Sequence, residues 1–417
     1  MNRQLLTGNA AAWGARLARA DYVPAFPITP QTEIIETLSA WCDTGEMAAR
    51  LVTLESEHAM LTAAAAAAST GVRVFTATSS QGLLYAMEMI YTVAGWRAPF
   101  VLVNVSRGLA SPITLEPDHT DVLAARDAGF LQIHCATCQE VVDSVLLAYR
   151  LAEDARVRLP AIVNLDGYYL SFTREPVELP ALELVDRFLP PFEPHELAFR
   201  ASQPLSQAVV VLGGSTYSYF RYESHLAALA ALDVYDEIAA DYAALTGRRH
   251  DVVEAWRLED AEYAFAMMGS FATKAKAAVE RLREAGVAIG LLRLRLLRPF
   301  PAAAIRQALA GKRAVAVIDQ NLSMGLGGVL HGELASALYG QSDAPPILAS
   351  FIGGLGGRDL PSEEFYAIAE VLHEAARSGV TPPPRLLYTE HELRELRKLQ
   401  AIALAERHDP RLGGRGP

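Results

Sequence analysis

Several polar and charged residues stand directly after apolar runs that have the composition of buried β-strands. A carboxylate in such a place can exchange protons, and an arginine can bind an anionic substrate. Functional groups in parallel α/β sheets gather at the carboxyl ends of the strands, so we expect these residues to share one edge of a sheet. The residues in these positions are Thr29, Glu55, Glu57, Ser79, Ser80, Gln81, Gly82, Arg107, Asp118, His119 and Asp166.

Each of these residues also has an ordinary structural interpretation. Glu57 could be a first-turn helix acid, which the helix dipole favours. Arg107 could be a surface cation, and His119 could cap a loop. The site is therefore predicted from their common position and not from any one of them.

Two prolines bracket Thr29 in the stretch Phe-Pro-Ile-Thr-Pro-Gln-Thr-Glu at residues 26–33. Proline fixes its own φ and restricts the residue before it, so Pro27 and Pro30 hold the threonine hydroxyl in a narrow range of positions. An N-cap threonine or a plain rigid turn would explain the same pattern.

The Cys-x-x-Cys spacing of Cys135 and Cys138 suggests redox or metal chemistry. Such a site needs partners that a chain with three cysteines lacks, and Cys135 closes an apolar stretch, so we interpret both cysteines as structural. Glycine-rich stretches at residues 325–328 and 353–357 lack the strand–GxGxxG–helix context of a nucleotide site, which favours turns. A Gly-Asp-Gly with a downstream asparagine, which would bind a magnesium diphosphate, does not occur in the sequence, and no metal ligand is predicted.

Strand-like and helix-like segments alternate over residues 1–180, which is typical of an α/β fold with a parallel sheet. The strands are continuous apolar runs, as expected when helices cover both faces of the sheet. We predict strands at Tyr22–Phe26, Val72–Ala77, Phe100–Val105, Phe130–His134 and Ala161–Leu165. We predict helices at Thr32–Trp41, Glu57–Ser69, Leu83–Gly95, Thr120–Asp127 and Cys138–Asp154.

Prolines among acidic and aromatic residues predict an extended linker at residues 181–207. A second α/β unit is predicted at 208–345, and a C-terminal segment and tail at 346–417. The strands expected there are Ala208–Leu212, Glu259–Met268, Ile289–Leu296 and Ala314–Ile318, and the helices are Ala272–Ala285 and Ala303–Ala310. A charged helix is expected from Thr389 onwards.

The composition is that of a globular protein, with 51% apolar and 20% charged residues. The formal net charge of −11 argues against nucleic acid as the main partner. No run approaches the ~20 apolar residues of a membrane span, and the first residues, Met1–Ala20, lack a signal-peptide core. Together with the few cysteines, this predicts a cytoplasmic location.

Several of these stretches together resemble a known family, the α subunit of 2-oxoacid:ferredoxin oxidoreductases of the pyruvate synthase type. They occur in family order from about residue 20 to about residue 360, so the resemblance covers most of the chain. The matching stretches are Phe26–Glu33, Glu55–Ala59, Thr78–Leu84, Ser106–Ala110, Asp118–Asp121, Asn164–Gly167, Leu297–Pro301, Ile318–Ser323 and Gly353–Asp359.

The resemblance implies a thiamine-diphosphate enzyme divided among subunits. The first unit would be a pyrimidine-type thiamine-diphosphate-binding domain with a parallel sheet, and the second a transketolase C-terminal-like α/β domain. A partner β subunit would hold the diphosphate and Mg²⁺. Iron–sulfur clusters would lie on other chains, a γ subunit and a ferredoxin-like subunit. The activity implied is oxidative decarboxylation of a 2-oxoacid with coenzyme A to acyl-CoA, CO₂ and reduced acceptor.

The resemblance also implies roles for individual residues. Glu57 matches the glutamate that bonds the pyrimidine ring of the cofactor, where a shared proton favours the reactive tautomer. Thr29 matches a catalytic threonine that contacts the substrate, and Arg107 an arginine that pairs with the substrate carboxylate. Further cofactor contacts are expected from Pro27, Ser80 and Gln81. Further substrate contacts are expected from Asp118 and His119.

The identity of the 2-oxoacid stays open at this point. The loop Ser111–Asp118, next to the presumed substrate, departs from the Ala-Pro-Ile-Asn pattern of many relatives, so an aryl-glyoxylate such as phenylglyoxylate is as credible as pyruvate. A transketolase-like or 2-oxoacid dehydrogenase-like thiamine enzyme and a non-catalytic scaffold subunit are the alternatives. The final electron acceptor, the direction of the reaction and the stoichiometry of the complex do not follow from the sequence.

Overall fold

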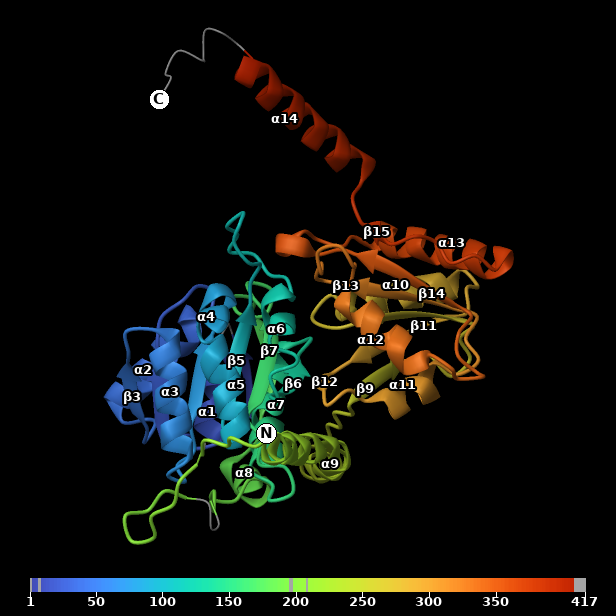
Figure 1. Cartoon of the computed structure of the whole chain (residues 1–417). Helices are drawn as coiled ribbons and strands as arrows, with labels where there is room; N and C mark the ends of the chain where they lie inside the picture. Colours follow the sequence, from blue (N-terminus) through green and yellow to red (C-terminus); the bar gives the residue numbers. More distant parts are fainter. Residues whose placement is uncertain (1, 7–8, 195–197, 208, 409–417) are drawn as a thin grey trace.

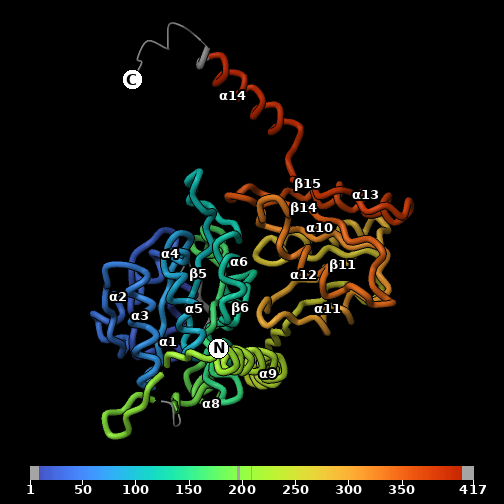
Figure 2. The backbone as a smooth tube through the Cα atoms, viewed as in Figure 1, coloured from blue at the N-terminus to red at the C-terminus, as the bar shows by residue number. Residues whose placement is uncertain are grey.

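The computed structural model describes residues 2–6, 9–194, 198–207 and 209–408. Two α/β units lie side by side, and a C-terminal helix projects away from both (Figures 1 and 2). Each unit is built on a mainly parallel sheet. The predicted α/β fold class is therefore confirmed.

The sheet of the first unit has the strand order β12-β6-β7-β5-β4. Its strands β4, β5, β6 and β7 run parallel, and all their residues are buried, as the continuous apolar runs predicted. A parallel pair, β2 and β3, continues this sheet through a bridge from Tyr22 to Val74. The bounds are β2 Tyr22–Ala25, β3 Arg50–Thr53, β4 Phe75–Thr78, β5 Val101–Ser106, β6 Leu131–His134, β7 Ala161–Asp166 and β12 Leu296–Arg298.

Helices cover both faces of this sheet. Apolar residues of α1 and α7 form one core with the strands, and those of α3 and α5 form another on the opposite face. The bounds are α1 Ala10–Leu17, α2 Thr32–Thr44, α3 Glu57–Ala68, α4 Ser80–Tyr85, α5 Met87–Trp96, α6 Thr120–Ala124 and α7 Cys138–Ala152. Two short strands, β1 Asn2–Leu6 and β8 Glu175–Leu179, pair antiparallel beside this unit.

The segment between the units differs from its prediction. Helix α8 (Leu182–Phe188) lies in the predicted linker, and a long helix, α9 (Gly214–Thr246), follows it unpredicted. The strand expected at Ala208–Leu212 is wrong for residues 209–212, which form no strand, and residue 208 lies outside the described residues. The three valines at 209–211 suit a sheet, but a strand needs a neighbouring strand, and Leu212 is 96% exposed.

The second unit has a sheet of order β15-β14-β13-β10-β11-β9, in which β9 alone runs antiparallel. Helices α10 and α13 pack on one face, and α11 and α12 on the other. The strands are β9 Val253–Trp256, β10 Tyr263–Met267, β11 Ile289–Leu294, β13 Ala314–Asp319, β14 Ile347–Ile352 and β15 Arg385–Leu386. The helices are α10 Ala272–Glu284, α11 Ala302–Leu309, α12 Val329–Leu338, the 3₁₀ turn η2 Leu355–Gly357 and α13 Ser362–Ser378. The predicted domain boundaries at residues 180, 207 and 345 stay predictions. Strand β14, which begins just after residue 345, pairs with β13 in the sheet of the second unit.

One strand ties the two units together. The run predicted as a single strand at Ile289–Leu296 divides into β11, which joins the second sheet, and β12, which pairs antiparallel with β6 of the first. The buried cluster that includes α3 and α5 also contains residues of β10, β11 and β13, so the two units share apolar core.

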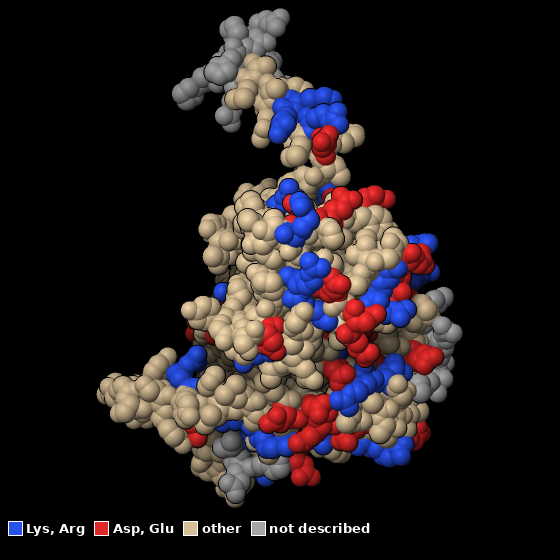
Figure 3. Space-filling view, turned by 90° about the vertical axis from the view of Figure 1, so that its right-hand side faces the viewer, with Lys and Arg blue, Asp and Glu red and all other residues tan. Residues whose placement is uncertain are grey.

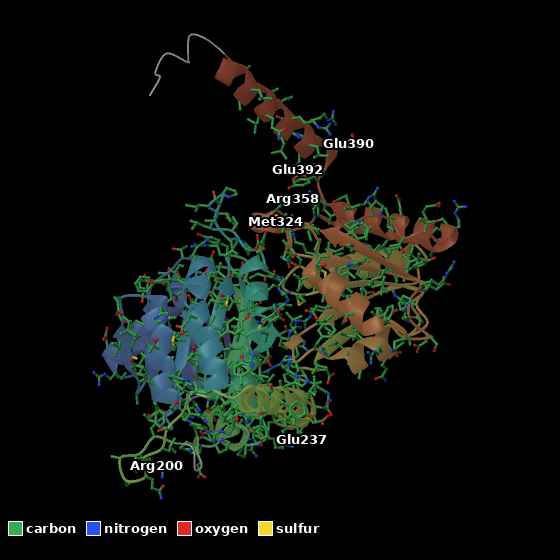
Figure 4. The ribbon with its side chains drawn as sticks, viewed as in Figure 1. Arg200, Glu237, Met324, Arg358, Glu390 and Glu392 are labelled. Atoms are coloured by element: carbon green, nitrogen blue, oxygen red, sulfur yellow. The ribbon has the colours of Figure 1, made fainter. Side chains whose placement is uncertain are left out.

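The charged C-terminal helix is present as α14 (Glu390–His408). Its first turn is attached to the second unit through Arg358, which bonds Glu364. Arg358 also bonds Glu392 of α14, and both of these residues are labelled in Figure 4. On the face shown in Figure 3, Lys and Arg side chains lie interspersed with Asp and Glu. Within the described ranges, every helix is too short or too polar to cross a bilayer.

Candidate active site

Glu57 opens helix α3 at the carboxyl end of β3. Ser56 caps this helix by accepting a hydrogen bond from the Ala59 amide, 3.2 Å away, which places Glu57 in the first turn. The Glu57 side chain is buried, with 5% exposure, and burial raises the pKa of its carboxyl. Within the described part of the chain, no other residue donates a hydrogen bond to this carboxylate, so its acceptor capacity is available to a ligand.

Gly82, in the first turn of α4, leaves the space that the Glu57 carboxylate occupies. A Cβ added to Gly82 would lie 2.4 Å from Glu57 Oε1 and 2.5 Å from Thr78 Oγ1. The hydroxyls of Thr78 and Ser79 are also buried and have no hydrogen-bond partner in the structure. Polar groups buried in this way are rare unless a ligand or water satisfies them.

Arg107 follows β5, and its guanidinium is half-buried. Nη1 donates to the Thr29 carbonyl and Nη2 to Gln81 Oε1, both at 2.7 Å, while Nε is buried and has no partner within the described part of the chain. Neither acceptor carries a charge, and among the described residues no carboxylate forms an ion pair with this arginine. Burial lowers the pKa of Arg107, and nearby Asp121 opposes that effect. Because Nε is enclosed by the protein, one N–H group on each terminal nitrogen remains for an anion.

Thr29 lies in the turn between β2 and α2, where its carbonyl, rather than its hydroxyl, binds Arg107. Among the described residues the hydroxyl has no hydrogen-bond partner. Pro27, expected to contact the cofactor, is exposed on the same turn. The turn therefore does bring Thr29 against Arg107, as predicted from the strand ends.

Ser80 and Gln81 begin α4 at the end of β4. The Ser80 hydroxyl lies 3.0 Å from the Gly108 carbonyl and 2.6 Å from Gln81 Oε1. Gln81 contacts Arg107, and the next residue, Gly82, contacts Glu57. The first turn of α4 thus lies between the Glu57 carboxylate and the Arg107 guanidinium and places both.

Asp118 and His119 have partners outside this group. Asp118 accepts from the Thr120 amide at 2.9 Å, and the Gly356 amide of the second unit lies 3.4 Å from it. The ring of His119 is buried and donates to Asp166 Oδ1 at 2.7 Å, which raises the pKa of His119 despite its burial. The structure thus gives both side chains roles at the boundary between the units.

Two other sequence features lie away from the site. Glu55, at the end of β3, is exposed, so its carboxylate faces solvent. Cys135 and Cys138 are free and buried, and burial raises the pKa of Cys135 to about 12 and also that of Cys138. Thiols held protonated in this way are unreactive, which suits the structural interpretation. Among the described residues, no group of three or more His, Cys, Asp and Glu could hold a metal ion.

Asp121 lies at the centre of the candidate site, although its residue type and position in the sequence did not predict a role for it. It is fully buried, and its carboxylate accepts hydrogen bonds from the amides of Ser80 and Arg107. The available signal was its place in the Asp-His-Thr-Asp stretch after the loop that follows Arg107.

Two family models match the chain. Residues 13–242 match the model described as pyruvate flavodoxin/ferredoxin oxidoreductase, thiamine diphosphate-binding. Residues 261–365 match the model of pyruvate:ferredoxin oxidoreductase core domain II. The first match contains every residue of the candidate site described above.

Curated relatives match over nearly their full length. The chain is 39% identical over 373 residues to pyruvate synthase subunit PorA of Methanothermobacter thermautotrophicus, covering 88% of this chain and 94% of that one. It is 38% identical over 379 residues to ketoisovalerate oxidoreductase subunit VorA of Pyrococcus horikoshii, covering 90% and 95%.

A solved structure shares the fold. It is the 2-oxoglutarate:ferredoxin oxidoreductase from Magnetococcus marinus with 2-oxoglutarate, coenzyme A and succinyl-CoA bound, with a TM-score of 0.67 and 19% identity. The match covers 90% of this chain and 65% of that one.

Proposed function

This chain belongs to the pyruvate:ferredoxin oxidoreductase family, and we propose that it is the subunit whose Glu57 and Arg107 serve oxidative decarboxylation of a 2-oxoacid. The reaction uses thiamine diphosphate and coenzyme A and yields acyl-CoA, CO₂ and a reduced acceptor. The observation that carries the proposal is a half-buried arginine that the first turn of α4 connects to a buried glutamate. Among the residues that the structure describes, no carboxylate pairs with this arginine and no other residue donates to this glutamate. That arrangement also argues against a non-catalytic scaffold.

The residues present fit the pyrimidine half of thiamine diphosphate. Glu57 offers a buried carboxyl with raised pKa, and the orphaned hydroxyls of Thr78 and Ser79 lie at the adjacent end of β4. Ser80, Gln81 and Pro27 stand at the same edge and are proposed to line the cofactor. When bound, thiamine diphosphate supplies the electron sink that decarboxylation of a 2-oxoacid requires.

Glu57 holds the proton for this chemistry. Because burial raises its pKa, the carboxyl keeps a proton at a pH at which a solvated glutamate has lost it. A general acid–base group works best when its pKa approaches the working pH. Glu57 can therefore share a proton with a ring nitrogen in both directions.

Arg107 binds and orients the substrate. Its free N–H groups suit the planar carboxylate of a 2-oxoacid, with which a guanidinium forms two parallel hydrogen bonds. The neutral acceptors Thr29 and Gln81 fix the guanidinium plane without cancelling its charge. The Thr29 hydroxyl is proposed to contact the substrate from the same turn. The substrate contacts predicted for Asp118 and His119 stay predictions.

The remaining parts of the enzyme are proposed to lie on other subunits. The relatives are named as subunits of pyruvate synthase and ketoisovalerate oxidoreductase. This sequence lacks the Gly-Asp-Gly motif for a magnesium diphosphate, so a β subunit would hold the diphosphate and Mg²⁺. Because this chain has three cysteines and a cluster needs four thiolate ligands, the iron–sulfur clusters are proposed to lie on a γ subunit and a ferredoxin-like subunit.

The test is purification of the native complex and assay of acceptor reduction with coenzyme A. The substrates are pyruvate, 3-methyl-2-oxobutanoate, 2-oxoglutarate and phenylglyoxylate, which differ in the side chain on the 2-oxoacid. Glu57→Gln should lower turnover by on the order of 10²–10⁴-fold, the typical contribution of a general acid–base group. Wild-type turnover in that variant would contradict the role of Glu57.

Arg107→Ala provides a separate measurement on the same complex. Loss of two charge-assisted hydrogen bonds should raise KM for the 2-oxoacid by on the order of 10²-fold, with a smaller change in kcat. An unchanged KM would remove the carboxylate-binding role of Arg107.

A further inference from the structure

Asp121 lies behind the candidate site, at the start of α6. Its carboxylate is fully buried and fully hydrogen-bonded by the protein. Oδ2 accepts from the Ser80 amide at 3.0 Å, the Arg107 amide at 3.2 Å and Asn104 Nδ2 at 3.1 Å. Oδ1 accepts from the Val122 amide at 2.7 Å and lies 3.1 Å from the Ser106 hydroxyl.

One oxygen of Asp121 therefore binds the ends of two neighbouring strands. Ser80 follows β4 and precedes Gln81, whereas Arg107 follows β5. Arg107 Nη2 donates to Gln81 Oε1 at 2.7 Å. Because Asp121 binds the backbone amides of Ser80 and Arg107, it sets the distance between the two chain segments that make this contact. A shift of either amide would reorient the guanidinium.

The backbone of Ser80 also indicates that this turn is held from outside. Its φ is +50°, in the left-handed region that residues with a Cβ rarely adopt. Such a conformation persists where surrounding contacts impose it, and these residues cluster at functional sites. The bond from the Ser80 amide to Asp121 is one of the contacts that impose it.

The segment that carries Asp121 is fixed by the second unit. The His119 amide donates to the Gln320 carbonyl at 2.8 Å, and the Gly357 amide donates to the Pro117 carbonyl at 2.7 Å. Ser270 donates from its amide, at 2.7 Å, and its hydroxyl, at 2.6 Å, to Asp166, which holds the His119 ring. Two segments of the second unit thus bond residues 117–119 directly, and a third, at Ser270, holds the Asp166 carboxylate that accepts from the His119 ring.

We propose that Asp121 is a positioning residue that sets the Arg107 guanidinium for the substrate carboxylate, from a segment anchored by the second unit. This inference rests on the proposed function of Arg107. It gives the second unit a part in substrate recognition, although that unit contributes no side chain to the guanidinium contacts described here.

The experiment is a double-mutant cycle in the full complex, with Asp121→Asn, Arg107→Ala and the double variant. Asn keeps the shape but cannot accept all the N–H groups that face Asp121. We expect Asp121→Asn to raise KM for the 2-oxoacid about tenfold, with a smaller change in kcat. In the Arg107→Ala background the same substitution should leave KM unchanged, because the guanidinium that it positions is gone.

The matched control is Asp143→Asn in helix α7. Asp143 is also fully buried and also accepts from several groups, namely Tyr242, Arg248 and His250. It should lower Tm without a change in KM. If Asp121→Asn fails to assemble, Ser106→Ala weakens the same cluster and should raise KM about threefold in the same cycle.

Additive effects of Asp121→Asn and Arg107→Ala on KM, or an unchanged KM in Asp121→Asn, would overturn the inference. The outcome is separable from failure of the proposed function. If Arg107→Ala alone leaves KM unchanged, the carboxylate-binding role of Arg107 fails first, whatever Asp121 does.

Discussion

Substitution of Gly82 by alanine would test the placement of Glu57 directly. Gly82 lies within α4, and its backbone conformation is one that alanine adopts readily. An added Cβ would stand 2.4 Å from Glu57 Oε1, and real Cβ contacts essentially never fall under 3.0 Å. The added Cβ would also stand 2.5 Å from Thr78 Oγ1, on a buried and stiff strand residue. The Glu57 carboxylate is the end of a flexible side chain, so it is the group that is displaced furthest.

The size of the effect follows from that contact. Glu57 Oε1 must retreat by at least about 0.6 Å from its place, and misplacement of a reacting group by about 1 Å can cost on the order of 10²-fold in rate. Alanine favours a helix interior over glycine by about 1 kcal/mol, which partly offsets the crowding against the buried Thr78 hydroxyl. We therefore expect turnover to fall by on the order of 10²-fold, with at most a modest loss of Tm.

The assay is the initial rate of acceptor reduction by the full complex at saturating coenzyme A and 2-oxoacid, together with thermal denaturation. Gly95→Ala in α5 is the matched control, because among the described residues no atom beyond its chain neighbours and its own helix backbone lies within 4 Å of the added Cβ. That control should keep wild-type turnover. Wild-type turnover in Gly82→Ala would refute the reasoning, because it would mean that the position of the Glu57 carboxylate does not limit the reaction.

Two further predictions concern buried ionisable groups. Burial raises the thiol pKa of Cys135 and Cys138, so brief alkylation of the native chain at pH 8 should label at most Cys42. Mass spectrometry of the unfolded chain should show three labels. Labelling of Cys135 or Cys138 in the native chain would contradict their burial. Burial raises the pKa of Asp319 to about 7 from 3.8, so the folded chain keeps a proton that the unfolded chain loses between about pH 4 and pH 7. Stability should therefore fall as pH rises through that window, by up to about 4 kcal/mol, relative to Asp319→Asn. Parallel Tm curves of the two proteins from pH 5 to pH 8 would count against this.

Much of the first unit could be predicted from local pattern. Runs such as Phe100–Val105 and Ala161–Leu165 are continuously apolar because helices cover both faces of the sheet, and they appear as β5 and β7. The N-cap residue Ser56 and the acid Glu57 likewise mark the start of α3. Since strand ends collect at one edge, the neighbourhood of Thr29, Gln81 and Arg107 followed from the same pattern.

Other features depended on partners that no local pattern contains. Residues 209–212 have the composition of a strand, but no sheet edge receives them. The pattern at Ile289–Leu296 predicts one strand, but Leu296 at its end begins β12, which pairs with β6 of the first sheet. The substrate contact expected of His119 stays a prediction, and only the fold shows that its ring bonds Asp166.

The sequence by itself determined the α/β class, the family resemblance and which side chains could carry acid–base and carboxylate-binding chemistry. These properties depend on residue types and short spacings, which local sterics and burial translate directly into strands, turns and helix starts. The tertiary structure alone decided that Thr29 offers its carbonyl to Arg107, that Gly82 makes room for Glu57, and that Asp121 joins two strand ends. Each of those contacts joins residues 14 or more positions apart, and packing of the whole chain sets their distance.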